Sequence, residues 1–199
     1  MTKSIFLLFL FLSTSISLFP QELNHFPVKS GIIKYELKGR TNGSQIIYFD
    51  EFGELINEWN SRIINSAGKT ISEASIKIIK NDSIFELDLQ SQSINIKPLN
   101  KESNQNLQNL ISNDMINAMA YKEIGIMNIA GVNCIEYSGE NGKLWTWNNI
   151  VMKTEMNVMN IHILKEATEI IIGIDIPKTK FEIPENYKTH QENGQLINQ

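Results

Sequence analysis

The chain has 199 residues and a formal charge of −4, and its two arginines, Arg40 and Arg62, are far from any run of lysines. No stripe of basic side chains could neutralise a row of phosphates, so nucleic acid is excluded as a partner. The single cysteine, Cys134, cannot form an intramolecular disulfide, and the fold must therefore be held by its hydrophobic core.

Residues 1–20 have the layout of a secretory signal peptide. Lys3 supplies the positive start, residues 5–12 form an apolar core, and Ser15 and Ser17 are small residues near a cleavage site. A transmembrane anchor needs about 20 apolar residues, and this run is shorter. We therefore expect a protein that is exported to the periplasm or the extracellular space, is soluble after cleavage and has no stable membrane insertion.

Turn residues recur at strand spacing in the first half of the remaining chain. Asn42-Gly43 and Asn81-Asp82 are predicted to form hairpin turns, because these residue types tolerate positive φ angles. Between the turns, apolar and polar residues alternate with the period of two that is typical of strands. The pattern predicts an antiparallel meander of five strands at residues 31–38, 45–49, 55–64, 70–80 and 83–89.

The period changes after Pro98. Between residues 103 and 121, apolar side chains recur every three or four positions and polar ones fill the other side, which predicts an amphipathic helix. We expect this helix to pack across one face of the sheet. Its apolar stripe consists of Leu107, Leu110, Ile111, Met115, Ala118 and Met119.

Strand patterns return after Gly125 and continue to Pro177. The expected strands include residues 133–138, 143–147 and 150–154, followed by a strand-rich stretch at 159–176. The sequence thus predicts an α+β fold that is mostly antiparallel β, with at least one helix packed across the sheet. Residues 21–189 are expected to form a single domain, followed by a polar tail at 190–199.

Three segments between residues 130 and 187 carry a family resemblance: AGVNCIEYSG, GKLWTWNNIVMKTEM and KFEIPENY. They resemble the C-terminal half of the periplasmic lipoprotein-carrier (LolA/LolB-like) superfamily and, more closely, exported domains of unknown function related to it. SGIIKYELKG fits the first strand of such domains. The matching positions are Gly131, Cys134, Tyr137, Trp145, Lys153, Phe181, Pro184 and Tyr187.

The resemblance has consequences for fold and ligand. It implies a strongly curved sheet or half-barrel closed by helices, with an apolar cavity between the sheet and the helices. In the carriers, that cavity takes the acyl chains of lipoproteins. A hydrophobic ligand or an acylated protein is therefore the expected partner.

Residues that could carry catalysis or bind metal lack the necessary patterns. His25, His162 and His190 are far apart and have no metal-ligand spacing, so surface or core roles are favoured. Cys134 has no sequence signature of an activating neighbour, which favours a buried structural thiol. We expect no metal or other cofactor.

An acidic cluster lies at one predicted turn. Asp50, Glu51 and Glu54 lack the regular spacing of a calcium loop, so a solvated hairpin end is the favoured interpretation. No nucleophile, phosphate-binding or dinucleotide motif is present in the sequence. We therefore expect a noncatalytic protein.

Aromatic and methionine side chains form the candidate ligand site. Trp145 and Trp147 share one face of a strand, and methionine adapts to irregular apolar partners. The same residues would also suit a core filled by its own side chains, and the two tryptophans would suit a docking patch. The candidates are Tyr35, Trp59, Trp145, Trp147, Met152 and Met156.

Two functions follow from these patterns. The leading hypothesis is a noncatalytic exported domain that binds a hydrophobic, lipid-like or acylated ligand in a curved-sheet cavity. The alternative is an envelope protein–protein interaction module with a self-filled core and no ligand. A lipid mass retained in native mass spectrometry would separate them.

Export is directly testable. If residues 1–20 form a cleaved leader, the mature N-terminus lies between residues 18 and 21 and carries no lipid. N-terminal sequencing of the secreted protein measures this. Recovery of intact Met1 in an integral membrane fraction would contradict the prediction.

Overall fold

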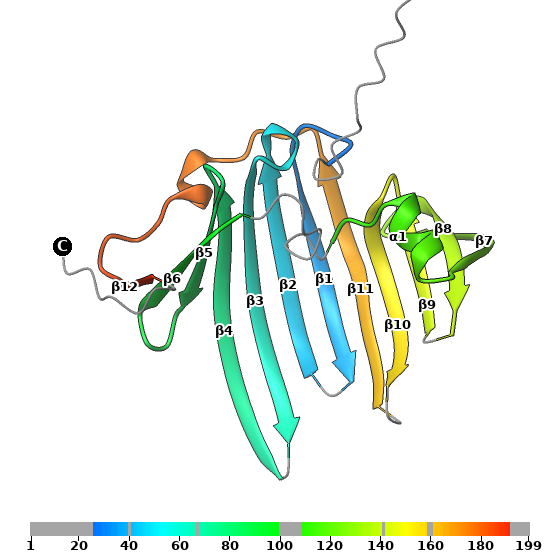
Figure 1. Cartoon of the computed structure of the whole chain (residues 1–199), viewed down its shortest axis with the longest axis horizontal. Coiled ribbons are helices and arrows are strands. Elements are labelled where there is room, and N and C mark those ends of the chain that lie inside the picture. The colour runs from blue at the N-terminus through cyan, green and yellow to red at the C-terminus, as the bar shows by residue number, and fades with distance from the viewer. Residues whose placement is uncertain are drawn as a thin grey trace, which may run out of the picture.

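A single open sheet of twelve strands forms nearly the whole structure. The computed structural model describes residues 26–39, 41–66, 68–99, 109–140, 142–158 and 161–191, and the expected leader at 1–20 lies outside them. Among these described residues, strands account for 67% and helices for 9%, and the sheet does not close on itself. Figure 1 shows the sheet as an arch with a short helix near one end.

The strands form two antiparallel meanders. The strands are β1 (Gly31–Gly39), β2 (Thr41–Asp50), β3 (Leu55–Ser66), β4 (Lys69–Lys80), β5 (Ser83–Asp88), β6 (Ser93–Pro98), β7 (Lys122–Ile129), β8 (Val132–Gly139), β9 (Gly142–Trp147), β10 (Ile150–Val158), β11 (Ile161–Ile172) and β12 (Lys188–Gln191). The helical elements are η1 (Glu51–Gly53), α1 (Asn113–Ala118) and η3 (Lys178–Phe181). The strand order is β12-β6-β5-β4-β3-β2-β1-β11-β10-β9-β8-β7, so pairing of β1 with β11 joins the meanders (Figure 1).

The expected antiparallel sheet is confirmed, and alternation explains its first strands. Ile33 and Tyr35 of β1 are buried together with Ile47 and Phe49 of β2, their neighbours on the same face. The polar residues between them point to the other face. The predicted turn at Asn81-Asp82 is also confirmed, since both residues have positive φ angles, 50° and 55°, between paired β4 and β5.

The Asn42-Gly43 turn prediction is wrong. Both residues lie inside β2, where Gly43 pairs with Leu37 of β1 and Arg62 of β3. A Cβ atom at Gly43 would lie 2.0 Å from the carbonyl oxygen of Ser61. The glycine therefore permits a close approach of two strands, and the chain reverses between β1 and β2 before it.

The predicted α+β class with a helix packed across the sheet is also wrong. The helix α1 has six residues, begins after Ser112 and is capped there, since the Ser112 hydroxyl accepts a hydrogen bond from the Met115 amide at 3.1 Å. Leu110 instead forms an isolated β-bridge with Ile150. The residues that recur at helical spacing thus belong partly to an extended segment and partly to one short helix. Residues 103–108 lie outside the described ranges.

Helix α1 covers only a small part of the sheet. Ile116 packs with Ile111, Leu144 and Val151, which places the helix against β9 and β10. None of the described helices is long and apolar enough to span a membrane. At the other end of the sheet, β12 pairs in parallel with β6 and includes His190 and Gln191, the first two residues of the expected tail.

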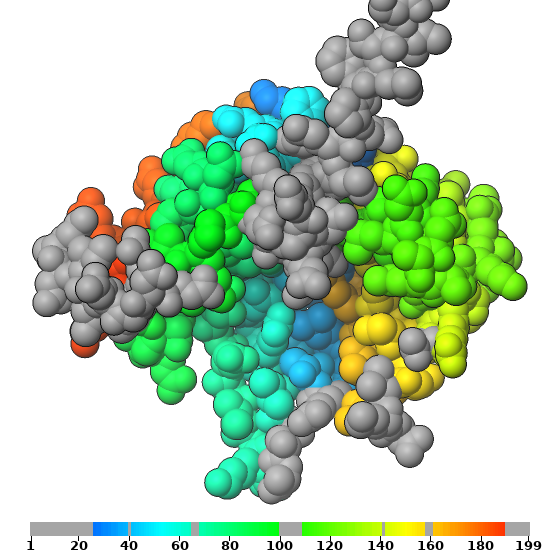
Figure 2. All heavy atoms as spheres, in the orientation of Figure 1, coloured from blue at the N-terminus to red at the C-terminus, as the bar shows by residue number. Residues whose placement is uncertain are grey.

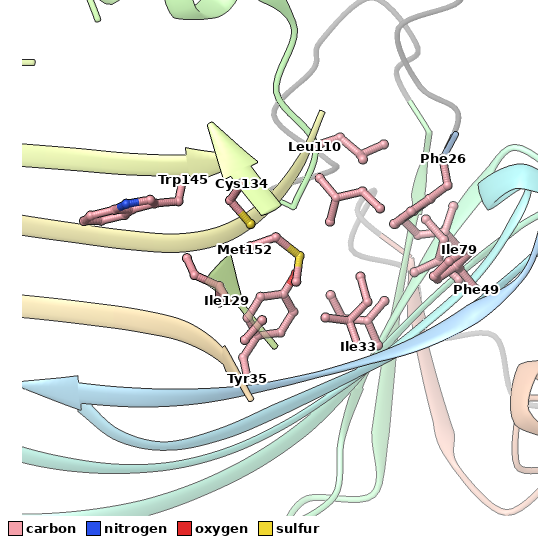
Figure 3. Close-up of a cluster of buried hydrophobic side chains, with 14 of the residues drawn as sticks. Phe26, Ile33, Tyr35, Phe49, Ile79, Leu110, Ile129, Cys134, Trp145 and Met152 are labelled. Carbon is pink, nitrogen blue, oxygen red and sulfur yellow. The ribbon is translucent and has the colours of Figure 1, made fainter. Parts of the chain in front are cut away.

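The main core joins both meanders. Figure 3 shows side chains of this cluster, including Tyr35 from β1 and Trp145 and Met152 from β9 and β10. At its edge, the rings of Phe26 and Phe49 stack with centroids 4.1 Å apart and planes 9° apart. This stack covers the end of the core with aromatic surface.

Removing Phe49 tests this packing. Because the ring is fully buried, Phe49→Ala is expected to lower the free energy of unfolding by about 3–5 kcal/mol. Chemical denaturation measures the loss. Ile63→Thr, at a position that is 46% exposed, is the control and should change stability by no more than about 0.5 kcal/mol. Equal small losses would contradict the assigned core.

Candidate functional site

A groove of about 1150 Å³ crosses the face of the sheet on which α1 lies. Figure 2 shows this face hollowed over β1 and β2. Small-molecule sites typically measure about 300–1,000 Å³, so the groove is large enough for an extended ligand. It has two chemically different walls.

The apolar wall comes from the segment around α1 and from β9 and β10. This segment is held to the sheet by two backbone hydrogen bonds, from Ile111 to Asn149 and from Val151 to Asn109, each of 2.9 Å. Three of the wall's side chains are methionines. The apolar wall consists of Leu110, Ile111, Met115, Met119, Tyr121, Leu144, Val151 and Met156.

The polar wall comes from β3 to β6. The strand register aligns side chains of these four strands in two rows on one face. Each row runs across the strands, one from Asn60 on β3 to Ser93 on β6 and the other from Glu58 on β3 to Asn95 on β6. Several small or aliphatic side chains lie among them. The polar wall consists of Glu58, Asn60, Arg62, Glu73, Ser75, Lys77, Glu86, Asp88, Gln90, Ser93 and Asn95.

A buried network connects the two meanders beside the groove. Glu58, only 4% exposed, accepts from Lys77 at 2.8 Å and from the Asn109 amide at 3.2 Å. Lys165 of β11 donates to the Asn109 side-chain oxygen, and its Nζ lies 4.2 Å from the centre of the Tyr35 ring. Asn109 therefore bridges a carboxylate on β3 and an ammonium on β11.

Burial changes the titration of this network. Desolvation lowers the pKa of Lys165 to about 8, opposed by the attraction of Glu58 and reinforced by repulsion from Lys77 and Arg62. The Tyr35 hydroxyl, which donates to the Val151 carbonyl at 2.9 Å, has its pKa raised by burial. Lys165 is thus the group in this network whose protonation changes at mildly alkaline pH.

Two polar atoms beside the groove lack a protein partner within the described residues. The side-chain oxygen of Asn60 accepts from Gln45 at 3.0 Å and from Arg62 at 3.3 Å. These bonds leave the other amide atom of Gln45, Oε1, and the Nε of Arg62 buried and unpaired. Buried polar atoms are normally satisfied, so this pair is notable for ligand binding.

The six predicted ligand residues do not form one site. Met156 lines the groove, whereas Tyr35, Trp145 and Met152 lie in the main core (Figure 3). Trp147 packs partly buried against the same core, and Trp59 is 45% exposed on the face opposite Glu58. The predicted sharing of one face by Trp145 and Trp147 agrees with their common cluster.

Residues weighed for catalysis or metal binding have structural surroundings. Cys134 is fully buried, and desolvation raises the pKa of its thiol to about 11, which keeps it protonated. His162 is exposed beside Glu155 at 3.2 Å. Among the described residues, no group of histidine, cysteine and acidic side chains could hold a metal ion. Glu51, in the predicted acidic hairpin end, pairs with Lys178 at 2.9 Å.

Sequence reasoning missed the polar wall and Asn109. The available signal was in β3, where Glu58, Asn60 and Arg62 recur with a period of two on a strand whose faces are both mixed. Such a row indicates a polar surface inside the arch once the sheet is known. Asn109 carried no signal, because it is one of the polar residues between positions 103 and 121 that the helical pattern places on the side away from the apolar stripe.

Sequence comparisons identify no relative, whereas structural comparisons find similar folds. No family model and no curated protein matches the chain. An uncharacterized conserved protein from Thermus thermophilus aligns with a TM-score of 0.55 and 8% identity, over 86% of this chain and 93% of that one. MucB aligns with a TM-score of 0.48 and 8% identity, over 83% of this chain and 61% of that one. PNGF-II aligns with a TM-score of 0.40 and 11% identity, over 83% of this chain and 31% of that one. At these identities, the likeness to the Thermus protein concerns the fold alone.

Titration of Lys165 can be measured through stability. The unfolded chain releases the lysine proton near 10.5 and the folded chain near 8, so this group makes the free energy of unfolding rise with pH between those values. Denaturation of the wild type and Lys165→Met at pH 7 and 9.5 isolates the effect. The wild type should gain stability relative to the variant at pH 9.5, and a constant difference would contradict the prediction.

Proposed function

We propose that this chain is a noncatalytic exported domain that binds a hydrophobic, lipid-like or acylated ligand in the groove. The observation that carries the proposal is the apolar wall, which presents eight hydrophobic side chains to a cavity of about 1150 Å³. Covering such surface stabilises a complex by about 25 cal/mol per Å². Export rests on the character of residues 1–20.

Methionine supports an apolar ligand of variable shape. Met115 comes from α1, Met119 from the C-terminal end of that helix and Met156 from β10, so the methionines of the apolar wall come from two different elements. Met119 is 54% exposed, although it lines a cavity. Flexible thioether side chains can adjust to different chains more readily than branched ones.

The lipoprotein-carrier resemblance agrees with this ligand class. The carriers accommodate acyl chains, and we include membership of that wider superfamily in the proposal. Its basis is the ordered set of short motifs between residues 130 and 187. The proposal does not include the transport activity of the carriers, because it requires only that the groove binds an acyl group.

Exposed apolar residues on edge strand β7 favour a second candidate, an envelope protein–protein interaction module. Ile124 and Ile126 are 54% and 71% exposed, and Ile126 pairs with Ile135, which is 37% exposed. As the last strand of the sheet, β7 also offers unpaired backbone groups to another strand. A partner protein would bind there without using the groove.

Two aspartate substitutions separate the candidates. Met156→Asp places a carboxylate on the apolar wall and should abolish binding of a fluorescent fatty acid, because burying the charge beneath an acyl chain is costly. Ile126→Asp, at the edge strand, should leave binding unchanged. Fluorescence titration gives both affinities, and circular dichroism checks the fold.

Met119→Asp provides a safer test of the same wall, since its exposed position should tolerate the charge without unfolding. It should weaken probe binding at least tenfold. A folded wild type that takes up no apolar probe would overturn ligand binding and leave the interaction module as the better candidate.

A further inference from the structure

We propose that the groove selects an amphipathic ligand with an uncharged head group rich in hydroxyl or amide groups. The ligand's apolar chain lies on the apolar wall and its head group lies on the polar wall. This inference rests on the proposed function, because it specifies the ligand that the groove would bind.

The groove is divided into an apolar and a polar part. One continuous cavity contacts methionine, leucine and isoleucine from the α1 segment, β9 and β10, and also contacts the polar rows of β3 to β6. A purely apolar ligand would cover the polar wall without satisfying it, at a cost for each buried group. A molecule with one apolar and one polar part matches both walls.

Positive and negative charges on the polar wall offset one another. Four carboxylates and two cationic side chains line the groove, and two further lysines lie at its margin. Glu58 pairs with Lys77 at 2.8 Å, and Glu86 pairs with Lys97 at 2.9 Å. Because these charges are largely compensated by one another, the wall has no strong net charge that would favour an ionic head group.

The polar wall also supplies neutral hydrogen-bonding groups. Hydroxyl and amide side chains both donate and accept, so they pair well with hydroxyl or amide groups of a ligand. They lie among the charged residues along both rows of the polar wall. The neutral groups in the rows are Asn60, Ser75, Ser93 and Asn95, and Gln90 lies in the turn between β5 and β6.

The unpaired atoms add an independent indication. Gln45 is only 4% exposed, pairs with Asn60 in the strand register and has an acceptor, Oε1, that no described residue pairs with. Arg62, on the groove wall, has a donor, Nε, that likewise has no partner in the described part of the chain. Both residues bond to the side-chain oxygen of Asn60. An acceptor and a donor that are both linked to Asn60 favour a ligand group that can donate and accept, which a hydroxyl or an amide does and a carboxylate or a quaternary ammonium does not.

Three amphiphiles with the same twelve-carbon chain test the head group. Dodecyl maltoside, dodecanoate and dodecyltrimethylammonium are titrated below their micelle concentrations at pH 7, with calorimetric readout. We expect the maltoside to bind at least tenfold more tightly than either ion. Equal or tighter binding of an ion overturns this inference but leaves the proposed function standing, whereas no binding of any amphiphile overturns both.

Variants of the polar wall locate the head group. The double variant Ser75→Ala with Asn95→Ala should lose at least fivefold in maltoside affinity and keep its affinity for dodecanoate. Ser61→Ala, exposed on the opposite face of β3, is the matched control and should change neither. Equal losses for both ligands would overturn the assignment of the head group to this wall.

Free maltose completes the experiment. Because the apolar chain supplies most of the expected binding, maltose alone should bind at least a hundredfold more weakly than dodecyl maltoside. Comparable affinity would indicate a sugar site that needs no chain and would overturn the amphipathic ligand.

Discussion

The pairing of β1 with β11 is the constraint on which the groove depends. It runs from Gly31 with Ile172 to Gly39 with Ile163 and joins the two meanders into one sheet. A Cβ atom at Gly31 would lie 2.5 Å from the carbonyl oxygen of Ile171, so this junction also requires a residue without a side chain. The pairing places Lys165 near enough to the β3 side for Asn109 to connect it with Glu58.

The polar interior of the arch is costly for stability. Glu58 and Lys77 form a largely buried ion pair, and an ion pair of this kind can be less stabilising than apolar residues of similar volume. Lys165 adds a further charge whose pKa is lowered by burial. A sequence shaped for stability alone would favour aliphatic residues at these positions, so their polarity supports a role in binding.

Local patterns in the sequence predicted much of the sheet but could not predict the groove. Alternation indicated most strands, and Asn81-Asp82 specified its turn, because these signals depend on neighbouring residues. The helix prediction was wrong at Leu110 and Ile111. Both residues belong to the apolar pattern with helical spacing, but they pack in two different clusters. The turn prediction at Asn42-Gly43 was wrong because the close approach of Ser61, which is distant in sequence, is what requires a glycine at position 43. Tertiary packing decided both cases.

A β-bulge explains why Met152 and Met156, two of the candidate ligand residues, lie on different faces. Strict alternation would put Met152 and Met156 on one face of β10, but the register with β9 shifts between Val151 and Lys153. Val151 and Met156 therefore line the groove together, while Met152 packs in the core with Trp145. A bulge depends on the partner strand, so residue type and spacing could identify apolar candidates without indicating which of them face a ligand.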